Sequence, residues 1–336
     1  MNLESRVTVK DVAKMAGVSP GTVSNALSGK RPVSEATRQR VLDAIEMLDY
    51  RPNLLARGLV NQQTGTLAVV AAGLEYFGPS RTLVGIEEKA TELGYSLLLD
   101  LLPLPQEDED VESVLDTVTA HRVDGIIWAV HEIDDNREWV VQDRLRQLPP
   151  VVFLTMGERP NLSILTTDNR KGTCLAVEHL IEQGRRTIGV VTGPLAWWEA
   201  QERLAAWRST LEAHGLKPLD SLVYHGNWSP ASGKQGLTTL LAANPALDAI
   251  FACNDQMALG VLRAAQLAGV PIPEQLAVVG FDNIPEAGYL SPPLTSVRQH
   301  LMRLGCEAVT QLHAMIEARS NGKPSPIPTV TLISPE

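Results

Sequence analysis

Three short polar side chains, Thr22, Ser24 and Asn25, stand on the outward side of a helix predicted over residues 20–28. Hydroxyl and amide groups of this size reach base edges and phosphates in the major groove of DNA. The same pattern would also suit an ordinary helical hairpin with a polar outer face. The segments around this helix decide between the two interpretations.

Residues 7–29 predict two short helices joined by a tight turn. Thr8 can cap a helix that begins at residue 9, and Asp11 stands three residues later, as in a capping box. Gly17 suits the left-handed position that ends a helix. The inner face of this helix is expected to hold Val12, Met15 and Ala16.

The second helix is expected to begin with Ser19 as its cap and Pro20 at its first position, where a missing N–H costs nothing. Two short helices around a glycine turn predict a helix-turn-helix unit. Pro20 and Gly21 offer little side chain, so base reading would depend on Thr22, Asn25 and the segment that follows the third helix. The residues expected to face DNA from this unit are Thr8, Ser19, Pro20, Gly21, Thr22, Ser24, Asn25 and Arg31.

A third helix is predicted from a cap at Ser34 to about Leu48, and the run Tyr-Arg-Pro-Asn follows at residues 50–53. The VTVKDVAKMAGVS run, the TVS triplet after it and this Tyr-x-Pro-Asn motif together resemble the lactose/purine repressor family (LacI/GalR). The resemblance covers nearly the whole chain, and in the sensor region it is strongest to the lactose repressor branch. It implies a DNA-binding transcriptional repressor.

The same resemblance implies a hinge helix after Pro52 that forms only on DNA and enters the minor groove. Such a short helix is not stable alone in water. By position, Asn53 would cap it, Leu59 would wedge between base pairs, and Ala56 and Arg57 would lie near the phosphates. A plain linker is the alternative.

Asn25 departs from the family, because many relatives carry Arg at this position. Asn prefers adenine by hydrogen-bond geometry, whereas Arg prefers guanine. We therefore expect the operator to differ from the usual family sequence at that base pair.

The charge of the chain is divided unevenly. The whole chain of 336 residues has a net charge of −10, which alone argues against a nucleic-acid binder. Residues 1–60, however, carry nine Lys/Arg and six Asp/Glu, whereas the remainder carries 20 and 33. A basic head on an acidic body places the attraction to phosphate in the head.

The sequence favours a cytoplasmic protein without catalytic or metal chemistry. Cys174, Cys253 and Cys306 are widely spaced, which indicates reduced core cysteines rather than a disulfide or metal site. We find no signal-peptide pattern and no apolar run near the length of a membrane span. No hydrolase elbow, phosphate-binding loop or dinucleotide motif is present, so no cofactor and no enzyme activity are expected.

From residue 64 onward, apolar strands alternate with helices, which predicts parallel sheets covered on both faces. With the resemblance, this indicates a two-lobed α/β sensor of the periplasmic-binding-protein type behind an all-α headpiece. Residues 139–148 are expected to be helical. The predicted domains are a headpiece (1–49), a hinge and linker (50–63) and an effector-binding and dimerisation domain (64–336), with an N-lobe of 64–165 and 299–325 and a C-lobe of 166–298 and 326–336.

Ligands of such sheets bind beyond the carboxyl ends of the strands, here in the cleft between the lobes. By resemblance, Arg203, Asn254 and Asp282 would bind sugar hydroxyls while the Trp228 ring covers an apolar sugar face. Trp228 could instead be core, and Asp282 a turn former. The full set of expected effector contacts is Ala72, Tyr76, Pro79, Ala129, Thr155, Trp198, Arg203, Trp228, Asn254, Asp282 and Leu301.

Two polar anchors of the lactose repressor branch are missing here, because Thr155 replaces an Asp and Ala129 an Asn. Trp197 and Trp198 add aromatic surface near the mouth of the cleft. These differences favour a larger glycoside or a disaccharide over a simple β-galactoside.

The sequence therefore predicts a repressor that binds a near-palindromic operator as a homodimer and is released by a sugar inducer. No leucine-heptad helix follows the last predicted strand, which favours a dimer over a tetramer. A purine-type corepressor with the opposite effect on DNA binding, and a transport-type sugar-binding protein, are the alternatives.

Overall fold

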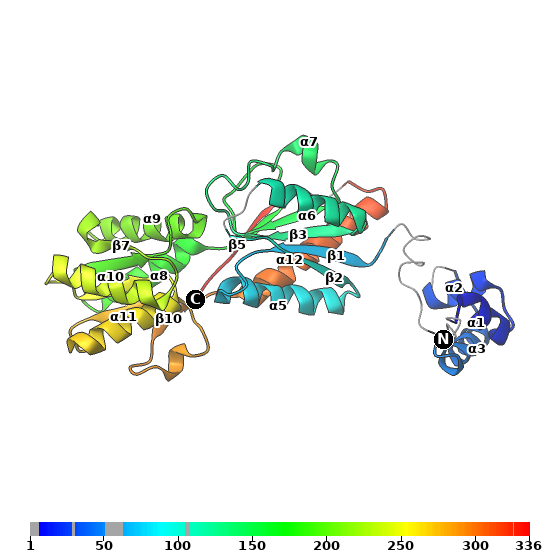
Figure 1. The fold of residues 1–336 in the computed structure, drawn as a ribbon, viewed down its shortest axis with the longest axis horizontal. Helices are drawn as coiled ribbons and strands as arrows, with labels where there is room; N and C mark the ends of the chain where they lie inside the picture. The colour runs from blue at the N-terminus through cyan, green and yellow to red at the C-terminus, as the bar shows by residue number, and fades with distance from the viewer. Residues whose placement is uncertain (1–6, 29–30, 51–62, 105–107, 325) are drawn as a thin grey trace. The chain divides into compact units, whose positions relative to one another are not determined.

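The computed structural model describes residues 7–28, 31–50, 63–104, 108–324 and 326–336. The chain divides into two compact units, Met1–Thr64 and Gly65–Glu336 (Figure 1). The expected hinge residues Asn53, Ala56, Arg57 and Leu59 lie outside the described residues.

Local capping fixes the three helices of the first unit, α1 (Val9–Ala16), α2 (Pro20–Ser28) and α3 (Glu35–Met47). The Asp11 carboxylate accepts hydrogen bonds from the N–H and the hydroxyl of Thr8, at 2.8 and 2.7 Å. Gly17 ends α1 with φ +64°. The Ser19 hydroxyl then accepts from the N–H of Thr22 at 3.1 Å. The predicted helix-turn-helix unit is confirmed.

The core of this unit is small and rich in alanine. It consists of Val12, Ala13, Ala16, Val23, Ala26, Val41 and Ala44. The prediction for Met15 was wrong, because its side chain is 51% exposed. Successive helical residues turn by about 100°, so Met15 lies to one side of a face centred on Val12, Ala13 and Ala16.

The second unit contains two parallel sheets, which confirms the predicted two-lobed α/β class. In the described part of the chain, the first sheet has the strand order β11-β5-β4-β3-β1-β2 and the second β10-β9-β8-β6-β7. The first lobe comprises β1 (Thr66–Ala71), α5 (Phe77–Glu92), β2 (Ser96–Leu101), α6 (Asp108–Ala120), β3 (Gly125–Ala129), α7 (Gln142–Leu145), β4 (Val151–Leu154), β5 (Ile164–Thr167), α12 (Leu301–Ser320) and β11 (Val330–Ile333).

The second lobe is built from the middle of the chain. It comprises α8 (Asn169–Glu182), β6 (Ile188–Thr192), α9 (Trp198–Ala213), η1 (Asp220–Leu222), β7 (Val223–His225), α10 (Pro230–Ala243), β8 (Ala249–Ala252), α11 (Asp255–Ala268), β9 (Ala277–Asp282), η2 (Ala287–Tyr289) and β10 (Thr295–Arg298). The chain crosses between the lobes after β5 and after β10, and after β11 its last residues contact the second lobe through Ser334 and Glu336.

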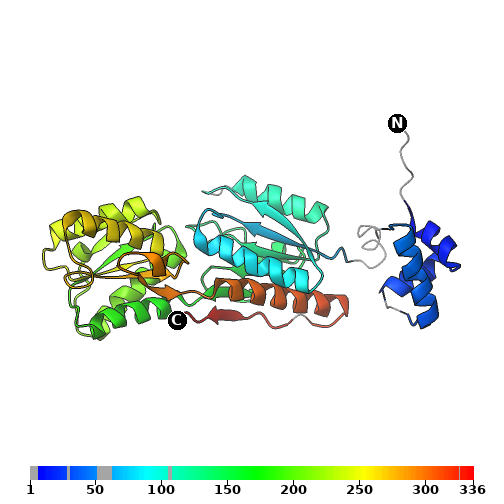
Figure 2. The ribbon, with the colours of Figure 1, turned by 90° about the horizontal axis from the view of Figure 1, so that it is seen from below.

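Helices cover both faces of the first sheet, as its apolar strands require. In Figures 1 and 2, α6 lies on one face and α5 and α12 lie on the other. The central strands β1, β3, β4 and β5 are almost entirely buried. Their carboxyl ends point toward the second lobe, and this places the loops that follow them at the cleft.

Two expectations differ from the structure. Residues 330–333, expected in the C-lobe, form β11 and pair with β5 in the N-lobe sheet. Residues 139–148 are helical only over the single turn of α7, because the Trp139 ring packs from an irregular segment onto Trp128 and Phe153. Within the described residues, no helix is both long enough and apolar enough to span a bilayer.

Candidate functional site

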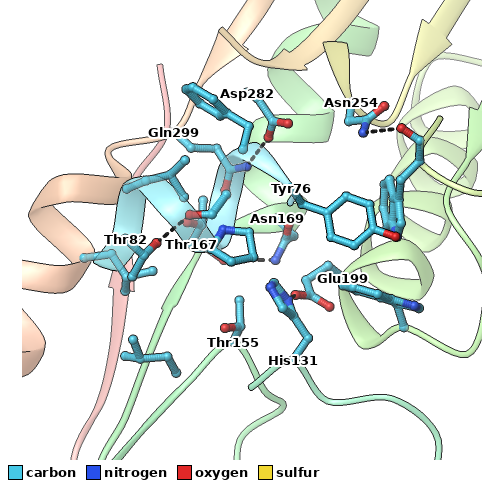
Figure 3. A pocket seen from close by; sticks show the side chains of 18 of the residues that line it. Tyr76, Thr82, His131, Thr155, Thr167, Asn169, Glu199, Asn254, Asp282 and Gln299 are labelled. Atoms are coloured by element: carbon cyan, nitrogen blue, oxygen red, sulfur yellow. Dashed lines mark hydrogen bonds and ion pairs between the residues drawn. The ribbon is translucent and has the colours of Figure 1, made fainter. Parts of the chain in front are cut away.

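The candidate site is the cleft between the two lobes, at the carboxyl ends of both parallel sheets (Figure 3). It encloses about 780 Å³ of unfilled space, counted with its open mouth. Its polar and aromatic side chains come from the loops after β1, β3, β4, β6, β7, β8 and β10, from the ends of β5 and β9, and from α5, α8, α9 and α11.

Arg203 of α9 is held rigidly in the second lobe, with only 6% of its surface exposed. Its Nε donates to Asn169 Oδ1 at 2.8 Å, and its Nη1 donates to the Cys253 carbonyl. The guanidinium carbon lies 3.9 Å from the centre of the Phe281 ring, a cation–π contact. Arg203 therefore presents a fixed positive charge to the cleft.

Asp282, the last residue of β9, faces the same region. Its carboxylate accepts a hydrogen bond from Gln299 Nε2 at 2.5 Å. Burial raises the pKa of Asp282 to about 7, although the nearby Arg203 acts in the opposite direction. At neutral pH this carboxyl group is therefore poised between its two protonation states.

Three of the predicted site residues have a strained backbone. Thr155, Trp228 and Asp282 have φ values of +53°, +67° and +118°, which side-chain-bearing residues rarely adopt. Such conformations cost roughly 1–3 kcal/mol each and concentrate at ligand sites.

Aromatic rings form a wall of the cleft. Trp197 meets Trp228 edge-on at 5.9 Å between centroids, and Tyr76 meets Trp197 edge-on at 5.7 Å. The Asn254 amide, which caps α11 by accepting from the N–H of Met257 at 2.8 Å, also donates to the Trp228 carbonyl at 3.0 Å. Asn254 thus fixes the position of Trp228.

Main-chain atoms join the lobes across the cleft, between residues 132–134 after β3 and residues 196–198 before and within α9. We call this contact the inter-lobe bridge. The N–H of Trp198 donates to the Glu132 carbonyl at 3.0 Å, and the N–H of Asp134 donates to the Ala196 carbonyl at 2.9 Å. The Glu132 carboxylate is anchored by Arg159 and by the N–H of Gly157 at 2.7 Å.

Most of the predicted effector contacts meet in this cleft. The residues that line it are Tyr76, Pro79, Ala129, Thr155, Arg203, Trp228, Asn254, Asp282 and Leu301. Ala72 does not line it, because it is buried in the core of the first lobe. Trp198 does not either: its indole nitrogen lies near Gly157, and its neighbour Trp197 lines the cleft instead.

The sequence reasoning missed several polar residues of the cleft. These are Thr82, His131, Thr167, Asn169, Glu199, Gln256 and Gln299. His131 and Gln299 follow the ends of β3 and β10, so the strand-end rule was the signal that could have found them. Within the described residues, no group of His, Cys, Asp and Glu is arranged to hold a metal ion.

The expected DNA contacts lie at the surface of the first unit. Thr8, Ser19, Pro20, Gly21, Ser24 and Arg31 are exposed, and Thr22 and Asn25 are half-buried. The hydroxyl groups of Ser19 and Thr22 share a hydrogen bond at 2.9 Å, so both are engaged at the start of α2.

Comparison with known proteins covers both units. The model of bacterial regulatory proteins of the lacI family matches residues 8–53, and that of a periplasmic binding protein-like domain matches residues 177–336. The chain is 33% identical over 322 residues to the HTH-type transcriptional repressor PurR of Haemophilus influenzae, covering 94% of this chain and 93% of that protein. It is 36% identical over 320 residues to the HTH-type transcriptional regulator AscG of Escherichia coli, covering 92% of each.

Solved structures agree. A lac repressor dimer bound to operator and the anti-inducer ONPF is 30% identical, with a TM-score of 0.86, covering 99% of this chain and 97% of that one. A complex of the transcriptional regulator CelR with cellobiose is 29% identical, with a TM-score of 0.72, covering 98% of both chains.

Proposed function

The chain belongs to the lacI family of bacterial regulatory proteins and is a DNA-binding transcriptional repressor, and from this premise we propose that a small carbohydrate bound in the cleft controls its affinity for operator DNA. The observation that carries this proposal is that Arg203 and Asp282 are both buried in the lining of the cleft and that the Arg203 guanidinium lies 5.7 Å from the centre of the Trp228 ring. A guanidinium and a carboxylate bind neighbouring hydroxyl groups, and an aromatic face covers the apolar side of a sugar ring.

The geometry of the aromatic wall supports a sugar over a flat base. A purine held between rings needs two nearly parallel faces, whereas Tyr76 and Trp197 meet at 88° and Trp197 and Trp228 at 72°. Two of the similar structures hold sugar-type ligands by name, cellobiose and ONPG. They support the same ligand class for this chain.

The proposed regulator is a homodimer on a near-palindromic operator, with α2 of each protomer in the major groove. The similar lac repressor structure is a dimer bound to operator. Ligand binding changes the relative position of the lobes, and through the linker it changes the DNA affinity. A coupling free energy of about 1–3 kcal/mol changes the affinity for operator DNA by roughly 5–150-fold, and bound DNA must weaken the binding of the ligand by the same factor.

A corepressor that strengthens DNA binding is the second candidate. The 33% identity to proteins named as the repressor PurR favours considering it. The cleft is the same in both cases, and only the sign of the coupling differs. Operator binding measured with and without ligand gives that sign directly.

The test is calorimetric titration of the full chain against monosaccharides, disaccharides and purines. Trp228→Ala and Asp282→Asn are expected to weaken sugar binding by about tenfold or more, since each removes a buried contact. Asp143→Asn, at a side chain that is 92% exposed, is the matched control and should bind as the wild type does. Purine binding, or sugar binding that ignores both cleft variants, would contradict the proposal.

A further inference from the structure

We propose that Glu199 and His131 form a second polar subsite of the cleft, which binds the hydroxyl groups of a second sugar ring, so that the effector is a two-ring glycoside. This inference rests on the proposed function and narrows its ligand class. It assigns a role to two side chains that are not part of the Arg203–Asp282 region of the cleft.

Glu199 is a buried carboxylate with a vacant acceptor. It lies in the first turn of α9 and lines the cleft, with a side chain only 4% exposed. One carboxylate oxygen contacts Nδ1 of His131. The other, Oε2, has no hydrogen-bond partner within the described part of the chain. A buried acceptor without a partner is costly, and a ligand hydroxyl would satisfy it.

His131 brings the opposite lobe into the subsite. It lies two residues beyond the end of β3 in the first lobe, whereas Glu199 comes from the second lobe. The His131 ring lies 4.9 Å from the Trp197 ring, between centroids. A ligand group at this position would therefore meet an acid, an imidazole and an indole edge contributed by both lobes.

The subsite lies on another side of the pocket than the Asp282 region. Glu199 and Arg203 are four residues apart on one face of α9, which separates them by about one helical turn of 5.4 Å along the axis. Figure 3 shows His131 and Glu199 on the opposite side of the pocket from Asp282 and Gln299. Two polar ends with an aromatic wall beside them match a ligand with two hydroxyl-bearing rings.

The pair could instead serve only to hold the lobes together, in which case its loss would weaken every ligand alike. A true subsite affects only ligands that reach it. The two roles therefore differ in how one substitution acts on a one-ring and a two-ring ligand.

The experiment compares methyl β-D-glucoside with cellobiose and methyl β-D-galactoside with lactose, by calorimetry on the full chain. In the wild type, a disaccharide should bind about tenfold tighter than the methyl glycoside of its terminal ring. Glu199→Ala should remove that advantage while changing methyl glycoside affinity by less than about twofold. Glu199→Gln, which keeps the shape and one acceptor oxygen, should lose less, and it serves as the check if the alanine variant folds poorly.

Glu202→Ala is the matched control, because Glu202 lies on the same helix and pairs with Arg170. Equal weakening of both ligand sizes by the Glu199 variants, or equal wild-type affinity for both, would overturn the second subsite and leave the proposed function standing. A wild-type chain that binds none of these sugars, nor any of the wider panel, would overturn the proposed function itself.

Discussion

The indole ring of Trp228 lies directly on the backbone of Gly193, so closely that a Cβ atom on Gly193 would come within 2.1 Å of the ring. Gly193 follows β6 and Trp228 follows β7, two neighbouring parallel strands. The position of the aromatic wall thus depends on the absence of a side chain at one residue.

Gly193→Ala should displace the Trp228 ring, since neither backbone nor indole can yield by more than a fraction of that overlap. We expect a loss of about tenfold or more in sugar affinity and a destabilisation of about 1–3 kcal/mol from overpacking. Calorimetry and urea unfolding measure the two effects. Gly288→Ala is the control, because a Cβ there meets open space; equal behaviour of the two variants would refute the role of this contact.

The Asp282 carboxyl group should make stability depend on pH. Its pKa is raised from 3.8 to about 7, so the folded chain holds a proton that the unfolded chain releases across this interval. The free energy of unfolding therefore falls as pH rises from about 4 to about 7. Asp282→Asn, which stays neutral, should match the wild type near pH 4 and exceed it by about 1–4 kcal/mol at pH 8.

Urea unfolding followed by tryptophan fluorescence reports this difference on the sensor, because all six tryptophans lie in residues 128–228. Burial also raises the pKa of Asp255, to about 6. The free energy of unfolding of the Asp282→Asn variant should therefore still fall with rising pH, but by less than that of the wild type. If the free energy of unfolding depends on pH in the same way in the wild type and in Asp282→Asn, the pKa of Asp282 is not raised and the prediction is wrong.

Asn25→Arg should change which base pair the repressor prefers. Asn bonds adenine in two places, whereas Arg bonds guanine, and each such pair discriminates by about 1–3 kcal/mol. Fluorescence anisotropy against operators that differ at single positions should show a switch from A·T to G·C at one position per half-site. Gln39→Arg adds the same charge on α3 and should raise affinity without a change in preference; a similar outcome for Asn25→Arg would rule out base reading by residue 25.

Trp198→Pro tests the inter-lobe bridge at a position that tolerates proline. Trp198 is the first residue of α9, and Trp197 before it has an extended backbone (φ −84°, ψ 126°), so the substitution removes one N–H without breaking the helix. Trp198→Ala removes the same side chain and keeps that N–H.

The proline variant should bind sugar about threefold to tenfold more weakly than the alanine variant, since one hydrogen bond contributes about 0.5–1.5 kcal/mol. Small-angle X-ray scattering should also show a larger radius of gyration for it without ligand. Identical binding and scattering of the two variants would mean that the bridge does not restrain the lobes.

Local chemistry made the first unit readable from its sequence. Helix caps and helix ends depend on residues no more than four positions apart, so they can be recognised in the sequence. This applies to the caps at Thr8, Ser19 and Ser34 and to the helix end at Gly17. Met15 was wrongly predicted to face the core, because in a helix of only eight residues a face that includes Met15 and one that excludes it differ by a small rotation.

Other parts of the fold were not predicted correctly, and one reason is that they pair with residues far away in the sequence. The sequence pattern did not indicate β5 or β10, because their residues (ILTT and TSVR) are partly polar and do not form a continuous apolar run. Residues 330–333 went to the wrong lobe because their partner strand lies more than 160 residues earlier. The 20-residue helix α12 was also missed, although its buried residues, such as Leu304 and Leu312, recur at helical spacing.

Asp282 and Asn254 were predicted by resemblance to lie in the cleft, and both stand at or just after the end of a strand, where ligands of parallel sheets bind. The contacts between side chains of the two lobes were not predictable. His131 and Glu199 are 68 residues apart, and nothing in either neighbourhood marks them as partners. Trp197 and Trp198 differ by one position, and only the true start of α9 decides which ring faces ligand.

The inter-lobe bridge is made by carbonyl and N–H groups, which every residue except proline supplies. Side chains around the cleft can therefore be exchanged during divergence without loss of the contact that ties the lobes together. A duplicated gene could acquire a new effector by altering residues such as Thr155, Trp197 and Glu199 while inheriting the main-chain contact between the lobes. The choice of ligand and the contact between the lobes would then evolve as separate traits.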